Sequence, residues 1–275
     1  MPEALESILR FEGVTVEFDG VPVLKDVSFE ALEGESRVIL GAAGSGKTIL
    51  LKTSLGLVKP DAGKVFVFGK DLTNLREREL FDIRSRIGML FQEGALFDSL
   101  NIEENVAYPL QYQKAIRCPK DQVHPRVAEA LKFVELGETL EKFPSELSGG
   151  MRRRAALARA VVTNPPLILC DSPTAGLDPI TSHTIMTLLI KARDVAHTTA
   201  LVVTHRYQDG NLIANFRYNS EQGGLEPARN GAKRDVRTTF MVLQEGGLVF
   251  EGDQAQLEES KDPYITKFVK QRERE

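Results

Sequence analysis

Gly41-Ala42-Ala43-Gly44-Ser45-Gly46-Lys47-Thr48 matches the phosphate-binding pattern GxxxxGK[S/T] at every fixed position. A short apolar run at residues 37–40 precedes it, and a helix is expected over residues 48–57. Glycines are needed here because the backbone must curl tightly and aim its N–H groups at phosphate oxygens. Lys47 would then reach the β- and γ-phosphates, and the Thr48 hydroxyl would bind Mg²⁺. The alternative, a plain glycine turn before a helix, is disfavoured by the strand and helix expected on either side.

Composition sets limits on the class of protein. The 275 residues are 42% apolar and 27% charged, as in an ordinary globular chain, and the net charge of -4 gives no basic footprint for nucleic acid. The two cysteines, Cys118 and Cys170, form no metal-binding or disulfide pattern, which suits a reducing compartment. We expect no membrane-spanning segment and no secretory signal, because the apolar runs are short and residues 1–10 carry acidic side chains.

Strand patterns surround the loop and predict an α/β fold. Residues 14–18 and 27–30 alternate around a Gly20-Val21-Pro22 turn as an antiparallel pair, and residues 64–68 alternate again. Residues 167–170 and 200–203 are continuous apolar runs, typical of parallel strands buried on both faces. The carboxyl ends of such strands are where open α/β sheets bind ligands.

The remaining segments divide the chain into regions. Helical spacing dominates residues 93–162, which we expect to be a helical subdomain inserted between two parts of one core, 8–92 and 163–255. Residues 219–237 resemble an exposed loop or insertion, residues 241–250 a terminal hairpin, and residues 262–275 a charged helix within a tail at 256–275. The whole chain, 1–275, is then a single domain.

Asp171 ends the apolar run 167–170. In a phosphate-loop nucleotidase a carboxylate in this place holds Mg²⁺ directly or through water. An aspartate after an apolar run is by itself more often a turn or cap residue, so this assignment depends on its pairing with the loop.

A second anion-binding pattern precedes a helix at residues 152–162. Leu147-Ser148-Gly149-Gly150-Met151 combines a capping serine with glycine N–H groups at a helix start. It resembles the signature motif of ABC ATPases. The resemblance implies a phosphate-loop (RecA-like) core with an antiparallel β subdomain and a helical signature subdomain, and a head-to-tail dimer in which the signature of one subunit closes over the ATP bound by the other.

Further positions match the family in order along the chain. Gln92 resembles the Q-loop glutamine that touches Mg²⁺, and Ala175-Gly176-Leu177-Asp178 resembles the D-loop at the dimer interface. His205 resembles the switch histidine that senses the γ-phosphate. Phe18 lies where the family keeps an aromatic residue to stack on adenine. Together these matches extend from residue 18 to about residue 252.

One position departs from the family. A glutamate that polarises the attacking water normally follows the Mg²⁺ aspartate, whereas this chain has Ser172. General-base assistance is worth about a hundredfold to ten-thousandfold, so slow hydrolysis is expected. Hydrolysis could depend on His205 with the substrate phosphate, on a nearby carboxylate such as Asp178 or Asp209, or on an unlike partner subunit. A fourth explanation is an engineered substitution at Ser172.

Two stretches narrow the resemblance further. Residues 84–110, RSRIGMLFQEGALFDSLNIEENVAYPL, and 146–160, ELSGGMRRRAALARA, are similar to ATPases of Mla-type phospholipid transport systems, as is DPYITKF at 262–268. This implies a homodimer or heterodimer at the cytoplasmic face of the inner membrane, together with permease subunits and Mce-type lipid-binding proteins. Residues 91–104, which mix aromatic, aliphatic and acidic side chains, are expected to receive a helix of the permease.

Two other classes of function compete with a transport motor. A DNA-repair or chromosome-organising ATPase would carry a long coiled coil or a zinc insertion, and a ribosome-acting factor would carry two cassettes; neither is seen here. The stronger alternative is a non-hydrolysing, ATP-gated clamp that Ser172 keeps closed.

Overall fold

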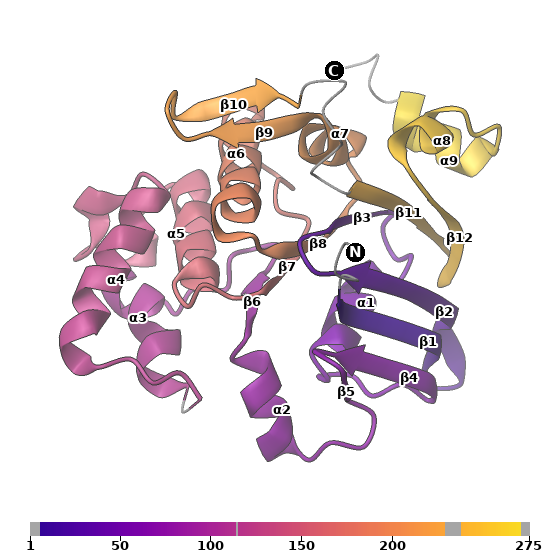
Figure 1. Ribbon diagram of the computed structural model, residues 1–275, viewed down its shortest axis with the longest axis horizontal. Coiled ribbons are helices and arrows are strands. Elements are labelled where there is room, and N and C mark those ends of the chain that lie inside the picture. Colours follow the sequence, from indigo (N-terminus) through magenta and orange to yellow (C-terminus); the bar gives the residue numbers. More distant parts are fainter. Residues whose placement is uncertain (1–5, 114, 229–237, 271–275) are drawn as a thin grey trace, which may run out of the picture.

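The computed structural model describes residues 6–113, 115–228 and 238–270. Two large sheets and a separate two-stranded hairpin make up its strands, with helices packed around them (Figure 1). The larger sheet has six strands in the order β12-β11-β3-β8-β7-β6. Its strands are β3 (Ser36–Leu40), β6 (Ile87–Leu90), β7 (Leu167–Asp171), β8 (Thr199–Thr204), β11 (Thr238–Gln244) and β12 (Gly247–Gly252). Five of them run parallel, and β12 pairs antiparallel with β11.

The smaller sheet is antiparallel and comes mostly from the N-terminal part of the described chain. Its order is β2-β1-β4-β5, built from β1 (Ser7–Phe18), β2 (Val21–Leu32), β4 (Ala62–Val67) and β5 (Lys70–Asp71). β1 and β2 are longer than the pair predicted around Gly20, because bulges let the ladder continue through irregular positions such as Gly13.

The helices fall into three groups. α1 (Lys47–Ser54) and α2 (Glu77–Arg84) flank the sheets, and α1 ends before the predicted residue 57. α3 (Ile102–Tyr112), α4 (Lys120–Phe133) and α5 (Gly149–Val161) pack on one another, with short 3-10 turns at Gly137–Thr139 and Pro144–Glu146. The remaining helices are α6 (Pro179–Ala196), α7 (Tyr207–Asn215), α8 (Gln254–Glu258) and α9 (Pro263–Lys270).

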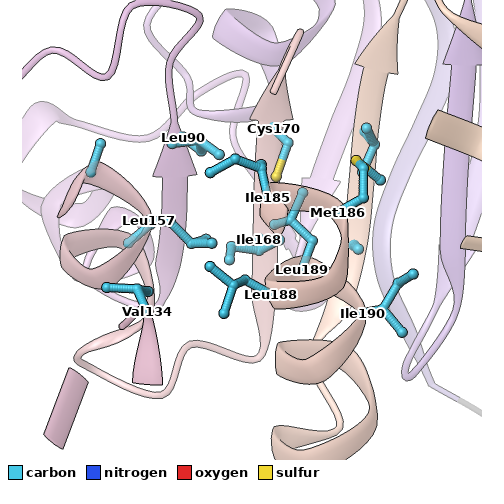
Figure 2. Close-up of a cluster of buried hydrophobic side chains, with 14 of the residues drawn as sticks. Leu90, Val134, Leu157, Ile168, Cys170, Ile185, Met186, Leu188, Leu189 and Ile190 are labelled. Atoms are coloured by element: carbon cyan, nitrogen blue, oxygen red, sulfur yellow. The ribbon is translucent and has the colours of Figure 1, made fainter. Parts of the chain in front are cut away.

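Both faces of the parallel strands are buried, which explains their continuous apolar sequences. Ile168 and Cys170 contribute to a core shared with the helices, whereas Leu167 and Leu169 face the antiparallel sheet and α1. Figure 2 shows Cys170 and Ile168 beside Leu157 of α5 and Ile185 of α6. Burial and the neighbouring Asp171 charge raise the pKa of the Cys170 thiol, while Cys118, between α3 and α4, is only partly buried.

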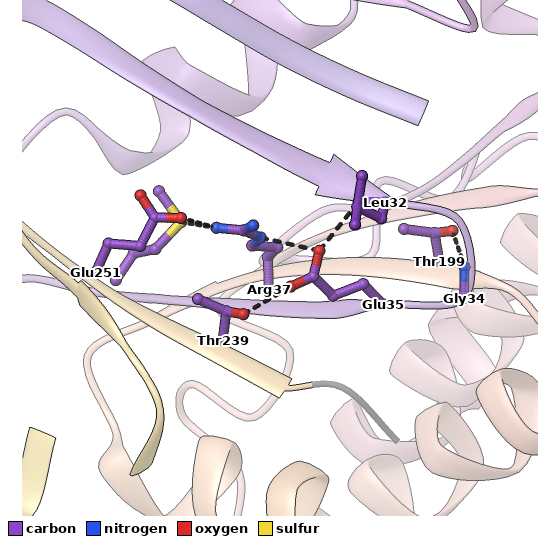
Figure 3. Close-up of polar contacts among 8 residues, drawn as sticks. Leu32, Gly34, Glu35, Arg37, Thr199, Thr239 and Glu251 are labelled. Carbon is purple, nitrogen blue, oxygen red and sulfur yellow. Dashed lines mark hydrogen bonds and ion pairs between the residues drawn. The ribbon is translucent and has the colours of Figure 1, made fainter. Parts of the chain in front are cut away.

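A buried polar network holds the start of β3. Arg37 is ion-paired with Glu35, at 3.2 Å, and with Glu251 of β12, and the Thr239 hydroxyl donates to Glu35 at 2.6 Å. Figure 3 shows these side chains linking β3 to β11 and β12. Removing one partner would leave a buried charge uncompensated, so the network fixes the C-terminal strands against the core.

The structure corrects two sequence expectations in the C-terminal half. Residues 216–219 and 224–227 form a hairpin, β9 (Phe216–Asn219) and β10 (Gly224–Pro227), where an exposed loop was expected over 219–237; residues 229–237 lie outside the described chain. The predicted hairpin at 241–250 is confirmed as β11 and β12, but β11 also joins the parallel sheet beside β3. The predicted helix at 262–275 is α9 as far as residue 270, and residues 271–275 are not described.

Within the described ranges, no helix combines the length and apolar character needed to cross a bilayer.

Candidate functional site

The site residues gather where four parallel strands end. β3 leads into Gly41, β6 into Gln92, β7 into Ser172 and β8 into His205. In register, Leu40 pairs with Thr204, Asp171 with Val203, and Leu90 with Cys170. Parallel strands in register end at the same edge of a sheet, so the four loops share one rim.

Glycine is required at two places in the phosphate-binding loop. Gly46 has φ 102°, and a Cβ there would lie 2.7 Å from the Val23 carbonyl oxygen. At Gly41 a Cβ would lie 2.7 Å from the Leu243 carbonyl oxygen. The loop therefore curls close to two neighbouring strands, leaving no room for a larger residue at these positions.

Lys47 supplies the positive charge of the loop. Its Nζ donates to the carbonyl oxygens of Gly41, at 2.8 Å, and Ala42, at 2.7 Å. Burial lowers the pKa of Lys47, and the Asp171 carboxylate opposes that effect. An ammonium beside the glycine loop, at the N-terminal end of α1, fits a phosphate group.

Thr48, Asp171 and Ser172 form a chain of hydrogen bonds beside the loop. The Thr48 hydroxyl donates to Asp171 Oδ2 at 2.7 Å, and the Ser172 hydroxyl donates to Asp171 Oδ1 at 3.0 Å. A hydroxyl and a carboxylate at this spacing fit Mg²⁺, which binds few protein oxygens and completes its shell with water and phosphate. No cluster of three acidic, histidine or cysteine side chains suited to a metal occurs in the ranges that the structure covers.

Ser172 is held by its backbone in a left-handed conformation. Its φ is 47°, and its N–H donates to the Val203 carbonyl oxygen at 2.8 Å. Its side chain is a hydroxyl, which near neutral pH does not accept a proton as a carboxylate does, so the residue itself brings no base to the site.

The two carboxylates predicted as possible substitutes both have hydrogen-bond partners. Asp178 accepts the N–H and the hydroxyl of Thr181, and these bonds lower its pKa, which weakens it as a base. Asp209 lies buried on α7, where it accepts hydroxyls from Thr174, at 2.8 Å, and Thr204, at 2.7 Å. Asp209 therefore links the segment after Ser172 to the strand that leads into His205.

The signature motif lies at the start of α5, which begins at Gly149, three residues before the predicted start at 152. Ser148 Oγ accepts the Met151 N–H at 3.2 Å, which makes it the N-cap, and a Cβ on Gly150 would lie 2.5 Å from the Thr181 side chain. α5 packs against β6 and α6, whereas α1 packs against β7 and β8. In the described chain no hydrogen bond joins residues 148–150 to the phosphate-binding loop.

Gln92, His205 and Phe18 are all exposed. Phe18 ends β1 with 47% of its surface accessible, Gln92 lies in a turn after β6, and His205 follows β8 directly. Among the hydrogen bonds of the described residues, none joins these three side chains to one another or to Asp171. Gln92 and His205 follow strands that end at the rim, whereas Phe18 ends a strand of the antiparallel sheet.

Tyr264 is a contact that the sequence did not reveal. Its hydroxyl on α9 accepts the Ala42 N–H at 3.0 Å and donates to the Leu243 carbonyl oxygen at 3.2 Å. The helix is held by its apolar side chains, Ile265 and Phe268, which are buried. A tyrosine 222 positions from the loop gives no local pattern. The one signal in the sequence is that Tyr264 belongs to the DPYITKF stretch.

A glycine loop between a central parallel strand and a helix, with a hydroxyl–carboxylate pair beside it, defines the phosphate-loop class of nucleotide-binding proteins. The ABC transporter family matches residues 24–175, and the chain belongs to that family as an ATP-binding cassette. The α/β fold with a phosphate-loop core, an antiparallel subdomain and a helical subdomain is thereby confirmed.

Relatives and solved structures agree with this assignment. The intermembrane phospholipid transport ATP-binding protein MlaF of Haemophilus influenzae is 31% identical over 265 residues, which are 96% of this chain and 91% of that protein, so the predicted resemblance to Mla-type ATPases is confirmed. The probable ribonucleotide transport ATP-binding protein mkl of Mycobacterium leprae is 39% identical over 197 residues, which are 72% of this chain but only 56% of that protein.

Structural similarity covers most of the chain. The ATP-binding cassette MJ0796, solved as a dimer in a post-hydrolysis state with ADP and Pi, has a TM-score of 0.74 and 30% identity over 89% of this chain and 98% of its own. The cbiO1 protein of Clostridium perfringens, part of the cbiONQ transporter complex, has a TM-score of 0.76 over 97% of this chain and 94% of its own; at 24% identity it supports the fold alone.

Proposed function

We propose that the chain binds and hydrolyses ATP with Mg²⁺ as the motor subunit of an ABC transporter that moves phospholipid between bacterial membranes. It would work at the cytoplasmic face of the inner membrane beside permease subunits and Mce-type lipid-binding proteins. The observation that carries the proposal is the pair of separate anion sites in one chain, the loop at α1 and the capped start of α5. A single nucleotide bound at the loop would meet the signature of a second subunit.

The predicted nucleotide- and metal-binding residues each have a role in this proposal, and His205 would sense the γ-phosphate. The backbone of Gly41, Ala42, Ala43, Gly44, Ser45 and Gly46 and the Lys47 ammonium would hold the phosphates, while Phe18 would stack on adenine. Thr48, Asp171 and Gln92 would hold Mg²⁺, which neutralises charge on the phosphate oxygens when bound. Ser148, Gly149, Gly150 and Asp178 of the second subunit would close the site.

The lengths over which the relatives align favour phospholipid over other cargo. The phospholipid transport protein aligns along nearly the whole chain, whereas the ribonucleotide transport relative aligns over a shorter part. The likeness of residues 84–110 and 262–268 to Mla-type ATPases adds to this argument.

An exposed row of aromatic rings supports a permease contact near Gln92. Phe97 and Tyr108 lie 4.8 Å apart between ring centroids, and Tyr108 and Tyr112 lie 4.7 Å apart. All three are at least a third exposed, next to the acidic Asp98 and Glu104. Aromatic residues with a polar rim are typical of protein interfaces.

Ser172 gives a specific reason to keep a second candidate, a clamp that binds ATP without hydrolysing it. One experiment separates the two. Purified protein is mixed with ATP and Mg²⁺, and phosphate release is measured alongside dimer formation by light scattering. Dimer formation with slow but continuous phosphate release supports the motor; dimer formation with no release supports the clamp; a chain that binds no ATP refutes both.

The transport assignment needs a separate test. The chain is purified from native membranes with a mild detergent, and the proteins that co-elute are identified by mass spectrometry. Recovery of a permease together with an Mce-domain protein supports phospholipid transport. A permease with a soluble solute-binding protein instead would assign another cargo.

A further inference from the structure

Arg153 is a buried cation that the predicted site does not use. It lies on α5, five residues after Ser148, and only 7% of its surface is accessible. Its guanidinium donates to three carbonyl oxygens in one short segment: Nη1 to Ser172 at 3.2 Å and to Pro173 at 3.1 Å, and Nη2 to Ala175 at 3.4 Å. Arg153 thus holds the backbone that directly follows the Mg²⁺ aspartate.

The helix that carries Arg153 is tied to its surroundings at its first turn as well. Ser148 caps α5, and Gly150 packs tightly against Thr181 of α6, whose hydroxyl donates to Asp178 at 2.6 Å. The start of α5 and the segment 172–175 are therefore joined by a rigid helix turn and a planar fork of donors.

Charge also concentrates at this point. Burial lowers the pKa of Arg153, and the carboxylates of Glu93 and Asp171 act against that effect. Glu93 follows Gln92, and the next carbonyl oxygen, that of Gly94, accepts a bond from Arg159 of the same helix at 2.8 Å. α5 therefore contacts the turn after β6 through Arg159 and the turn after β7 through Arg153.

We propose that Arg153 is a positioning residue that ties the signature helix of a subunit to its own hydrolysis segment, 172–175, through the Ser172, Pro173 and Ala175 carbonyls. This rests on the proposed head-to-tail dimer. The signature motif then serves the partner's nucleotide while Arg153 holds the segment beside the subunit's own nucleotide. A displacement of α5 caused by the partner's ATP moves residues 172–175, so the two ATP sites are coupled within one chain.

The test compares Arg153→Met with Arg154→Met. Arg154 is the matched control, because it is the next residue on α5 and also donates to carbonyl oxygens, those of Val134 and Glu135, but away from the site. Hydrogen exchange of full-length protein is followed by mass spectrometry. Loss of buried, charge-assisted bonds should make amides in 172–178 of the Arg153→Met variant exchange roughly tenfold faster, with Arg154→Met unchanged there.

Nucleotide binding and turnover distinguish positioning from general loosening. In Arg153→Met the affinity for a fluorescent ATP analogue should stay within about twofold, since Arg153 does not contact the loop, while turnover falls roughly tenfold. Coupling of the two ATP sites predicts that wild-type turnover depends cooperatively on ATP concentration, and Arg153→Met should lose that cooperativity. Arg153→Lys, which keeps the charge but not the fork, should recover part of both effects.

Several results would overturn the proposal. One is an exchange rate in residues 172–178 of Arg153→Met equal to that of wild type. Equal acceleration of exchange by Arg154→Met would also overturn it, and so would cooperative turnover of Arg153→Met. If Arg153→Met does not fold, the graded pair Arg153→Lys and Arg153→Gln decides the same question. A wild-type chain that binds no ATP would instead refute the proposed function, and the exchange result would still decide whether Arg153 holds the segment.

Discussion

The phosphate-binding loop and the segment 171–175 lie at the same sheet edge but are maintained differently. The loop is built from consecutive residues, and its cation, Lys47, bonds to carbonyls of the loop itself. The segment is held by distant residues, with Arg153, Asp209 and Val203 bonding to Ser172 and its neighbours. A local structure keeps its chemistry wherever its motif is intact. A structure held by distant contacts can change a reactive side chain, as at Ser172, and retain its backbone.

The largest predicted effect tests that difference directly. Ser172→Glu should raise ATP turnover about a hundredfold or more, because a carboxylate replaces a hydroxyl at a position whose backbone is already held. This corresponds to an activation free energy that is lower by about 3 kcal/mol or more. Turnover of the purified chain and of the assembled transporter is measured by phosphate release.

Ser172→Gln is the matched control for that variant. It has the same length as glutamate but cannot accept a proton, so its turnover should remain near that of wild type. Equal acceleration by both variants would mean that size, and not the carboxylate, limits the reaction.

A substitution in the phosphate-binding loop should lower the affinity for ATP more than the rate of the chemical step. Lys47→Met should weaken ATP binding by about 2 kcal/mol, roughly thirtyfold, because a charged hydrogen bond to phosphate is lost. Lys52→Met, on the exposed side of the same helix, should leave the affinity unchanged. Titration calorimetry gives both values, and equal weakening by the two variants would count against a special role for Lys47.

Asp209 tests how far distant contacts hold the segment. Asp209→Ala should lower the free energy of unfolding by between about 1 and 2 kcal/mol, since the hydroxyls of Thr174 and Thr204 lose their acceptor. Urea unfolding monitored by circular dichroism measures this loss.

The pH dependence of the same measurement has a definite sign. Burial raises the folded-state pKa of Asp209, so between its ordinary value and the raised value the folded chain binds more protons than the unfolded chain. The contribution of Asp209 to stability is therefore fully present below the ordinary aspartate pKa and falls as pH rises through the folded pKa. The difference in unfolding free energy between wild type and Asp209→Ala should become smaller as pH rises over that range. A difference that grows with pH would contradict a raised pKa of Asp209 in the folded chain.

The smallest effect concerns the C-terminal helix. Tyr264→Phe removes the hydroxyl that bonds to Ala42 and Leu243. It keeps the ring, whose centroid lies 5.3 Å from the centroid of the Phe268 ring. We expect a loss of about 1 kcal/mol in stability and a shift of less than about fivefold in ATP affinity. Tyr112→Phe, on an exposed tyrosine, is the control, and thermal melts with and without ATP measure both effects.

The sequence predicted most of what is local. The loop, the two parallel runs at 167–170 and 200–203 and the C-terminal hairpin each carry a pattern within ten or so residues. The loop lies between β3 and α1 as predicted, and the runs and the hairpin are strands of the structure. The helix α2 was missed because only Leu80 and Ile83 of its eight residues are buried, which is too few for a clear period.

Contacts between distant segments could not be predicted in this way. β9 and β10 pair across a polar turn, and β9 packs on α6, so an apparently exposed loop is a hairpin. The bonds from Arg153 to Ser172, from Thr174 to Asp209 and between Ala42 and Tyr264 span 19, 35 and 222 positions. Single residues of these types carry no periodic signal. The sequence predicted the motif residues of the candidate site, whereas the long-range contacts that hold their backbone in shape carry no local pattern.

The different burial of the two cysteines has a practical consequence for spectroscopy. Cys170 is enclosed in the core with its thiol kept protonated, while Cys118 is partly accessible between α3 and α4. Reactivity of a thiol requires access and thiolate character, so a maleimide dye should attach to Cys118 and spare Cys170. The native chain therefore accepts a single fluorophore on its helical side, and movements of those helices on nucleotide addition can be followed without engineering a labelling position.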